Sequence, residues 1–211
     1  MKDTTLLYLV RHGATEANER RPYVLQGRGI DKPLSAAGRA QAESVARFLS
    51  DFRIDAVYAS PMLRATETAA AIARPHGLEA LPLVELTECH VGAWEGMDWD
   101  SIRARHPEAY AAFHADPGCA PYLDGESYRD VLERVRPVFE RLLAEHAGGA
   151  IAVVAHNVVN RAWLAHVLGV EPRYAKDLRQ TNACVNVVRR RGDELRVLTL
   201  NAHFHVPGAL E

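Results

Sequence analysis

The chain has 211 residues, of which 48% are hydrophobic and 25% are charged, and its formal net charge at pH 7 is −2. This composition is typical of a soluble globular protein, long enough for one sizeable core or for one core with a cap. The slightly acidic balance argues against a general nucleic-acid binder, which would usually be basic, but it leaves room for a local basic pocket.

The cysteines and the first residues bear on where the protein works. Cys89, Cys119 and Cys184 are odd in number and widely spaced, which suits reduced cytosolic thiols better than a disulfide framework. The first apolar run breaks at Arg11, so it is too short for the core of a signal peptide and far too short to span a membrane. We therefore expect a cytoplasmic protein that does not act on a membrane.

Apolar runs and stretches of helical periodicity alternate along the first part of the chain. Residues 6–10 leave no room for polar alternation and predict a strand buried on both faces, after which Gly13 lets the backbone turn sharply. Ser60 and Pro61 are expected to begin a later helix as its N-cap and first turn. In chain order we expect a strand over 6–10, a loop over 16–29, a helix over 35–52, a strand over 55–60, a helix over 62–73 and a strand-like run over 81–86.

Residues 92–149 differ in kind, because they hold prolines and glycines and little that is typical of a strand. Helical pieces are expected near 99–105 and 107–114, and a long helix over 127–146 begins with an imperfect capping box, Ser127 to Asp130. We interpret this segment as a helical cap inserted into a single domain that spans residues 1–211.

The last third returns to strands and helices. Residues 150–155 are the most strand-like run in the chain and precede a helix over 157–168, and the strands 185–188 and 195–200 are expected to form a hairpin or edge pair. This alternation predicts an α/β three-layer sandwich: a mostly parallel central sheet with helices on both faces and a helical cap.

Two strands, one near each end of the chain, stop at a histidine: His12 and His156. In a parallel sheet both imidazoles would emerge at the same edge, where open α/β sheets bind ligands. Arg11 precedes His12, and Arg64 lies about one turn into a helix, whose side chains lean back toward that edge. Two guanidiniums and two imidazoles near helix N-termini predict a pocket for a phosphate dianion.

Other patterns carry less weight. His203 and His205 could suggest a metal pair, but no third ligand is indicated. Cys184 and Arg190 match the Cys-x5-Arg spacing of cysteine phosphatases, yet the residues between them would commit their amides to a β ladder instead of a phosphate loop. No Gly-x-x-x-x-Gly-Lys nucleotide loop occurs.

A series of short motifs, each at a strand or helix end, runs through most of the chain. In order they are Arg11-His12-Gly13, Thr15, Asn18, Ser60-Pro61 with Arg64, Glu88 before Gly92-Ala93-Trp94-Glu95-Gly96, and His156. Each is weak alone, but in this order they resemble the histidine phosphatase superfamily, also called phosphoglycerate-mutase-like, and in particular its short phosphatases.

The resemblance implies a role for each residue. His12 would attack phosphorus and become a phosphohistidine, its other ring nitrogen held by a backbone carbonyl. Arg11, Arg64 and His156 would hold the phosphoryl oxygens, and the cations would lower the pKa of His12. Glu88 would protonate the leaving alcohol and then deprotonate water, with its pKa raised by the nearby phosphate. No metal or other cofactor is implied, because the arginines supply the positive charge.

The resemblance also gives Asn18, Gln26 and Gly27 a contact with the phosphate or with the far end of the substrate. The chain departs from the family pattern at Asn157, where glycine is usual, and at Ala14, where an acidic residue is frequent. Asn157 could cap the following helix or contact the substrate, and both readings stay open.

The leading hypothesis is a metal-independent phosphomonoesterase that acts on a small phosphorylated metabolite. The alternatives are phosphoryl transfer of the phosphoglycerate mutase type, which the compact chain disfavours, and an inactive module that binds a phosphorylated ligand. Glu85 and Glu95 compete with Glu88 for the role of acid, although the position of Glu88 before the Gly92 turn favours it. The oligomeric state stays open, with a homodimer considered.

Overall fold

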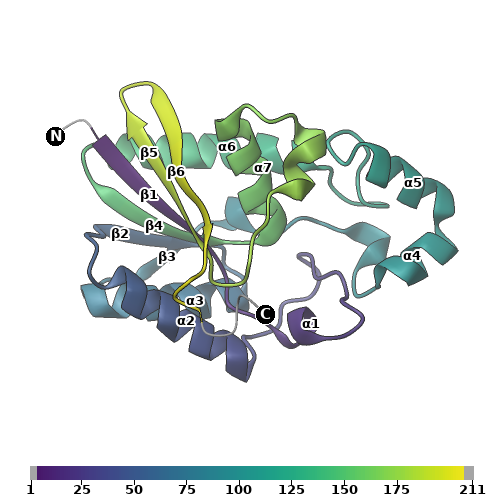
Figure 1. The fold of residues 1–211 in the computed structure, drawn as a ribbon, viewed down its shortest axis with the longest axis horizontal. Helices are drawn as coiled ribbons and strands as arrows, with labels where there is room; N and C mark the ends of the chain where they lie inside the picture. The colour runs from purple at the N-terminus through teal and green to yellow at the C-terminus, as the bar shows by residue number, and fades with distance from the viewer. Residues whose placement is uncertain (1–3, 207–211) are drawn as a thin grey trace.

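One central sheet organises the computed structural model, which describes residues 4–206. Six strands lie in the order β3-β2-β4-β1-β5-β6 (Figure 1): β1 (Thr4–Arg11), β2 (Ala56–Ala59), β3 (Ala80–Pro82), β4 (Ala150–Ala155), β5 (Val185–Arg191) and β6 (Glu194–Ala202). The first four strands are parallel to one another, whereas β5 and β6 form an antiparallel pair beside β1. The predicted mostly parallel sheet and its C-terminal hairpin are confirmed.

Helices cover both faces of this sheet and complete three layers. One face carries α2 (Ala36–Leu49) and α3 (Leu63–Ala73), and the other carries α6 (Tyr128–Glu145) and α7 (Asn157–Leu168) (Figure 1). Leu7 and Leu9 of β1 join the core under α6 and α7, while Tyr8 and Val10 join the core under α2 and α3. Because β1 is buried on both sides, its sequence shows no polar alternation.

Two predicted boundaries are wrong. The amide of Ser60 still donates to the carbonyl of Val154 on β4 (3.0 Å), so Ser60 prolongs the strand, and the N-cap of α3 is Met62 instead. The run over 81–86 is a strand only as far as Pro82, after which a single 3-10 turn follows. The 3-10 turns within residues 4–206 are η1 (Arg74–His76), η2 (Val84–Leu86), η3 (Gly92–Trp94) and η4 (Pro172–Asp177).

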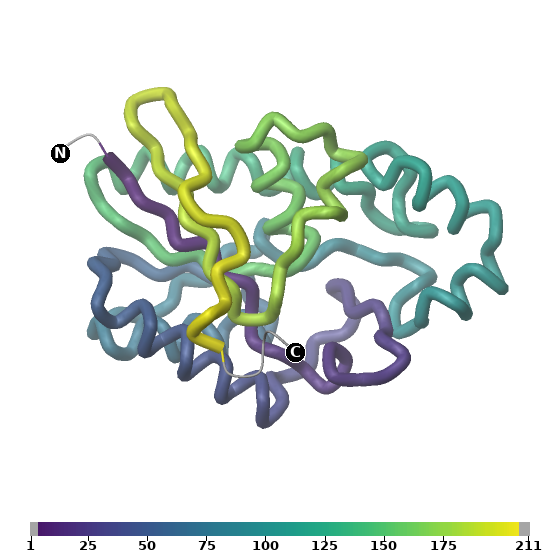
Figure 2. The backbone as a smooth tube through the Cα atoms, viewed as in Figure 1, coloured from purple at the N-terminus to yellow at the C-terminus, as the bar shows by residue number. Residues whose placement is uncertain are grey.

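The loop expected over 16–29 contains a short helix, α1 (Glu16–Glu19). Figure 2 shows the rest of this loop running beside the segment that follows η2. The two segments are tied by backbone hydrogen bonds, from Leu25 to Met97 (2.9 Å) and from Arg28 to Cys89 (3.1 Å). Residues 61 and 72 positions apart in the chain thus form one wall beside the sheet edge.

The segment 92–149 contains two kinds of helix. The short helices α4 (Trp99–Arg105) and α5 (Pro107–Ala115) project beyond the sheet (Figure 1), held by edge-on aromatic contacts of the buried Trp94 with Trp99 and Phe113. By contrast α6, which starts at the predicted Ser127–Asp130 capping box, packs on α7 and β1. The division of the chain into one domain with a cap over 92–149 remains a prediction. No helix within residues 4–206 has the length and apolar character that crossing a bilayer requires.

Candidate active site

The two histidines that end parallel strands meet at one edge of the sheet. β1 and β4 are neighbours, with Arg11 opposite Ala155, so the next residue of each strand emerges at the same level. The rings of His12 and His156 lie 5.1 Å apart between centroids, tilted by 61°. The convergence expected from the strand pattern is therefore present.

The His12 ring is oriented by contacts at both nitrogens. Its Nδ1 lies 2.7 Å from the carbonyl oxygen of Gly13, and Nε of Arg64 donates toward its Nε2 at 3.3 Å. When Nδ1 carries the proton and donates it to the carbonyl, Nε2 carries the lone pair that accepts from Arg64, and this is the lone pair that a nucleophile needs. Arg64 is 1% exposed, and its other nitrogens donate to the carbonyls of Ile30 (3.0 Å) and Gly27 (3.2 Å).

The backbone after His12 is wedged between two helices. The Gly13 amide donates to Thr68 Oγ1 on α3 (3.1 Å), and the Ala14 amide donates to Gln41 on α2 (2.8 Å). A side chain at Gly13 would collide with the carbonyl of Gly38 in the first turn of α2, and a side chain at Gly38 would collide with the Ala14 carbonyl. Gly13 is outside the left-handed region of φ, so glycine is needed for close approach rather than for a sharp turn.

Polar atoms without partners surround the two rings. Both ring nitrogens of His156 and Nε of Arg11 are buried and have no hydrogen-bond partner among residues 4–206. Nη1 of Arg11 is held by the carbonyl of Gln180 at 2.6 Å. Buried donors left unpaired are costly, and phosphoryl oxygens are the acceptors that would satisfy a guanidinium and an imidazole at this place.

Burial and positive charge keep both imidazoles neutral. Burial, then Arg64, lowers the pKa of His12 well below its usual value, and Arg11 lowers it further. The pKa of His156 is likewise lowered by burial and by Arg64. Two neutral imidazoles beside two guanidiniums suit nucleophilic attack on a phosphate, because a protonated ring could not attack.

Glu88 is the carboxylate nearest this chemistry. It is 4% exposed, and its oxygens accept from the amides of Cys89 (2.8 Å) and Val158 (3.4 Å). Burial raises its pKa, against the opposing effects of those amides and of both arginines. Of its rivals, Glu85 is exposed, and the Glu95 carboxylate accepts from two amides of the 16–29 loop. The structure thus favours Glu88 as the proton donor.

A helix that sequence analysis assigned to the cap also holds the Glu88 segment. Nη1 of Arg134 on α6 donates to the carbonyls of Glu85 (2.6 Å) and Thr87 (2.8 Å). Its remaining nitrogens pair with Glu126 (3.0 Å), which accepts from the His90 amide (2.7 Å). Arg134 therefore fixes the chain on both sides of Glu88. No sequence signal distinguishes it from a solvated helix arginine.

Arg11, His12 and Glu88 open into a small pocket that we call the catalytic hollow, whereas His156 and Arg64 lie outside its lining. It is lined by Arg11, His12, Asn18, Tyr23, Leu25, Gln26, Glu88, Val91, Tyr122, Asn157 and Val158. The predicted Asn18, Gln26 and Asn157 line it, whereas Gly27 contributes its carbonyl to Arg64 from outside. The tyrosines and aliphatic residues of the lining were not predicted, because they come from irregular segments without a motif.

Two asparagines differ in how they are held. The Asn18 side chain belongs to a capping box with Thr15 and also accepts from Asn182 (3.3 Å). The expected cap role of Asn157 is wrong, because His156 is the N-cap of α7 and Asn157 is its first residue. The Asn157 Oδ1 is buried without a hydrogen-bond partner among the described residues.

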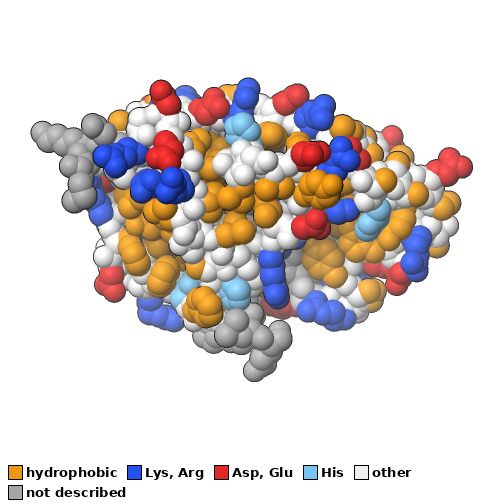
Figure 3. Space-filling view, turned by 45° about the horizontal axis from the view of Figure 1, so that its top comes forward, with side chains coloured by type: hydrophobic (Ala, Val, Ile, Leu, Met, Phe, Trp, Pro, Cys, Tyr) orange, Lys and Arg blue, Asp and Glu red, His pale blue; other side chains and the backbone are white. Residues whose placement is uncertain are grey.

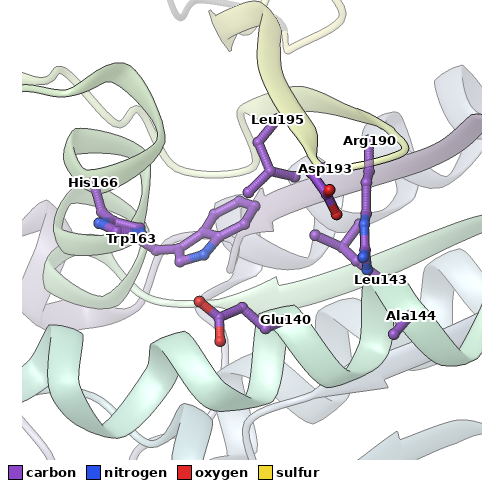
Figure 4. Close-up of a pocket in the computed structure, with 8 residues that line it drawn as sticks. All are labelled: Glu140, Leu143, Ala144, Trp163, His166, Arg190, Asp193 and Leu195. Atoms are coloured by element: carbon purple, nitrogen blue, oxygen red, sulfur yellow. The ribbon is translucent and has the colours of Figure 1, made fainter.

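The other sites considered do not match this geometry. Residues 4–206 contain no cluster of three His, Cys, Asp or Glu side chains able to hold a metal ion, and the residues after Cys184 pair along β5 with β1. Another cavity opens between α6, α7 and the β5–β6 hairpin (Figure 4). Its lining includes none of the predicted site residues, and its one histidine, His166, is exposed.

Comparisons with known proteins agree with this geometry. The model of the histidine phosphatase superfamily (branch 1) matches residues 7–203. Phosphoserine phosphatase 1 of Hydrogenobacter thermophilus is 31% identical over 200 residues, which is 95% of this chain and 93% of the relative. The metal-independent phosphoserine phosphatase of Arabidopsis thaliana is 34% identical over 197 residues, or 90% of this chain and 78% of the relative.

Solved structures show the same relationship. Bacillus stearothermophilus YhfR superposes with a TM-score of 0.87 at 29% identity, covering 96% of this chain and 99% of the other. A mycobacterial glucosyl-3-phosphoglycerate phosphatase gives a TM-score of 0.82 at 30% identity, with 94% and 99% covered. The chain therefore belongs to the histidine phosphatase superfamily and is a phosphatase that hydrolyses phosphate monoesters through a phosphohistidine.

Proposed function

We propose that His12 carries the phosphoryl group and that the other residues of the sheet edge act around it. Nε2 of His12 attacks phosphorus, and the bond from phosphorus to the alcohol oxygen breaks. Arg11, Arg64 and His156 hold the three non-bridging oxygens and offset the charge of the transition state. The observation that carries this proposal is the buried, neutral His12 ring, oriented by the Gly13 carbonyl and facing Arg64.

Glu88 moves the protons. Protonated at the start, it donates to the departing alcohol oxygen; as a carboxylate, it then accepts a proton from the water that attacks the phosphohistidine. Phosphate leaves, His12 is free again and Glu88 is reprotonated. Its burial supports this cycle, because a raised pKa keeps a carboxyl protonated closer to neutral pH.

The reaction as proposed needs no metal. The guanidiniums of Arg11 and Arg64 place two positive charges where a metal ion would otherwise act, and both are buried. A relative with 34% identity is named a metal-independent phosphatase, which supports the same property here.

The substrate is a small phosphorylated metabolite. The names of the relatives state phosphoserine and glucosyl-3-phosphoglycerate as their substrates. These substrates have a phosphate group in common but differ in the alcohol that carries it. Hydrolysis is favoured over mutase-type transfer. With 3-phosphoglycerate and a trace of the bisphosphate, free phosphate is expected; efficient isomerisation with little phosphate would contradict this choice.

The test of the reaction uses para-nitrophenyl phosphate in excess chelator. The wild-type protein is expected to hydrolyse it, and His12→Ala to lose activity by about four orders of magnitude, because the covalent pathway is removed. Acid-labile, base-stable phosphate should appear on the wild-type chain after quenching. His166→Ala, at an exposed position on α7, is the control that keeps activity. Activity retained in His12→Ala would exclude the proposed nucleophile, and no activity in the wild type would favour a phospho-ligand-binding module.

Two proposals concern the protein in the cell. A cytoplasmic location is supported by three free cysteines among the described residues. A homodimer is supported by the edge strand β6, on which Leu198 and Leu200 are exposed. Figure 3 shows that apolar side chains are exposed over much of one face of the molecule. Sedimentation of the wild-type protein should give twice the mass of one chain, and Leu198→Lys should reduce this mass to that of a single chain. A wild-type monomer would refute the dimer.

A further inference from the structure

The catalytic hollow has two ends with different chemistry. Its floor is the group formed by Arg11 and His12, which line the hollow, and by His156 and Arg64, which contact the His12 ring behind that lining. In the proposed function this group faces the transferred phosphoryl group. Its roof consists of Tyr23, Leu25, Val91, Tyr122, Asn157 and Val158, which surround the place of the departing alcohol. The composition of the roof restricts which alcohols can occupy it.

The roof holds no charged side chain. Among the described residues that line the catalytic hollow, the ionisable groups beyond the tyrosines are Arg11, His12 and Glu88. The first two belong to the floor, and Glu88 is committed to proton transfer. Neither a cation for a substrate carboxylate nor a second carboxylate for a substrate ammonium is left, and a buried charge without a partner binds poorly.

Arginines on the neighbouring loop do not supply the missing charge. The guanidinium of Arg21 is turned back onto its own loop, where it donates to the carbonyls of Asn18 (3.1 Å) and Arg20 (2.9 Å). Arg20 and Arg28 are exposed and lie outside the lining of the catalytic hollow. The roof therefore lacks charge because of the residues that line it, and not because a single arginine side chain is turned away.

The roof does offer neutral hydrogen-bonding groups. Oδ1 of Asn157 is buried without a partner at the start of α7, next to the Val158 amide that binds Glu88. Tyr122 is 4% exposed, and burial raises its pKa well above the usual value, so its hydroxyl stays protonated. By contrast, Gln26 is already bonded to Thr15 (2.7 Å) within its loop. An alcoholic hydroxyl both donates and accepts, which suits an amide and a phenol.

We propose that the substrate is the phosphate monoester of an uncharged polyhydroxy compound, such as a polyol or sugar, and that Asn157 hydrogen bonds to one of its hydroxyl groups. This inference rests on the proposed function, since it concerns the leaving alcohol of that reaction. It separates the chain from relatives named for phosphoserine, whose alcohol carries a carboxylate and an ammonium.

Three substrates with the same carbon skeleton test the proposal. Glycerol 3-phosphate has a neutral alcohol, 3-phosphoglycerate has a carboxylate in place of the hydroxymethyl group, and O-phosphoserine has in addition an ammonium in place of the remaining hydroxyl. We expect kcat/KM for glycerol 3-phosphate to exceed both others by about 100-fold. Equal or faster hydrolysis of either charged substrate would overturn the proposal while leaving the reaction itself intact.

Variants of Asn157 test the residue. In Asn157→Ala, the ratio of kcat/KM for glycerol 3-phosphate to that for para-nitrophenyl phosphate should fall about tenfold. The aryl ester has no alcoholic hydroxyl, so it loses no hydrogen bond when Asn157 is replaced. Asn157→Asp adds a carboxylate and should raise the relative rate on O-phosphoethanolamine. His166→Ala, on the same helix, should keep the wild-type ratio.

The outcomes distinguish the two levels of inference. An unchanged ratio in Asn157→Ala would remove Asn157 from substrate recognition. Failure to hydrolyse para-nitrophenyl phosphate, or hydrolysis that survives His12→Ala, would instead overturn the proposed function and with it the substrate class.

Discussion

The floor and the roof of the catalytic hollow are built in different ways. The floor takes its side chains from the ends of β1 and β4 and from the first turns of α3, which pack into the central sheet. The roof takes most of its side chains from the 16–29 loop and from the segments that precede α6. Charge is concentrated in the floor, and neutral groups occupy the roof. One end can therefore hold any phosphoryl group, while the other selects the alcohol.

Removing a guanidinium from the floor should have the largest effect among the changes that follow. We expect Arg64→Ala to lower kcat/KM about 1,000-fold on both an aryl and an alkyl phosphate, because a buried charge facing phosphorus is lost. Arg64→Lys should recover little, since a lysine cannot donate to the carbonyls of Ile30 and Gly27 as well. Thermal unfolding serves as the control for folding, and a loss below tenfold would contradict the role of Arg64.

Removing the proton donor should separate the two kinds of substrate. In Glu88→Gln, hydrolysis of glycerol 3-phosphate should fall about 100-fold, because its alkoxide is a poor leaving group that needs a proton. Hydrolysis of para-nitrophenyl phosphate should fall less, since nitrophenolate leaves without help. Equal losses on the two substrates would show that another group is the acid.

Loosening the segment that carries Glu88 should give a weaker form of the same pattern. Arg134→Ala removes the bonds to the Glu85 and Thr87 carbonyls before Glu88 and the ion pair with Glu126, which holds the His90 amide after it. This should cost about tenfold on the alkyl ester, with a smaller loss on the aryl ester. Arg136→Ala is the matched control, because Arg136 lies on the same helix in an exposed pair with Glu140. If both esters lose activity equally, Arg134 serves the fold and does not position the acid.

The smallest effect concerns stability in acid. The folded-state pKa values of His12 and His156 are depressed, so below pH 6.5 the unfolded chain takes up protons that the folded chain refuses. The free energy of unfolding should then fall by about 1.4 kcal/mol per pH unit for each histidine, until the pH reaches the folded-state pKa. Urea unfolding at pH 7.5 and 5.5 should show this loss, and replacing both histidines by asparagine should reduce it.

The same contrast explains what could be predicted from the sequence. His12, His156 and Arg64 sit at the ends of regular elements, and the geometry of a parallel sheet brings such ends together. Tyr122 and Val91 come from irregular segments, where neither periodicity nor spacing states which residues meet. Their positions depend on contacts between segments distant in the chain, such as the Leu25 to Met97 hydrogen bond.

At two positions, a local sequence signal for a helix N-cap was overridden by the boundaries of the neighbouring strand or helix. A serine followed by proline is typical of a helix start, yet the Ser60 amide remains bonded to Val154 of β4, and the N-cap position falls two residues later, on Met62. An asparagine after a strand is typical of a cap, yet at α7 the cap position falls on His156, which leaves Asn157 for the catalytic hollow. In both places a shift of one or two residues in the boundary changed the role.

The contact between Gly13 and Gly38 has a consequence for variation in this protein. Gly38 lies in the first turn of α2 and is not part of the catalytic hollow, but any side chain there would press on the Ala14 carbonyl, two residues after the nucleophile. In a random library screened for turnover, substitutions on the outer side of α2 should survive freely. Position 38 should stay glycine. Its intolerance to substitution, at a site remote from the metabolite, would then result from the close packing of the α2 backbone on the backbone that follows His12.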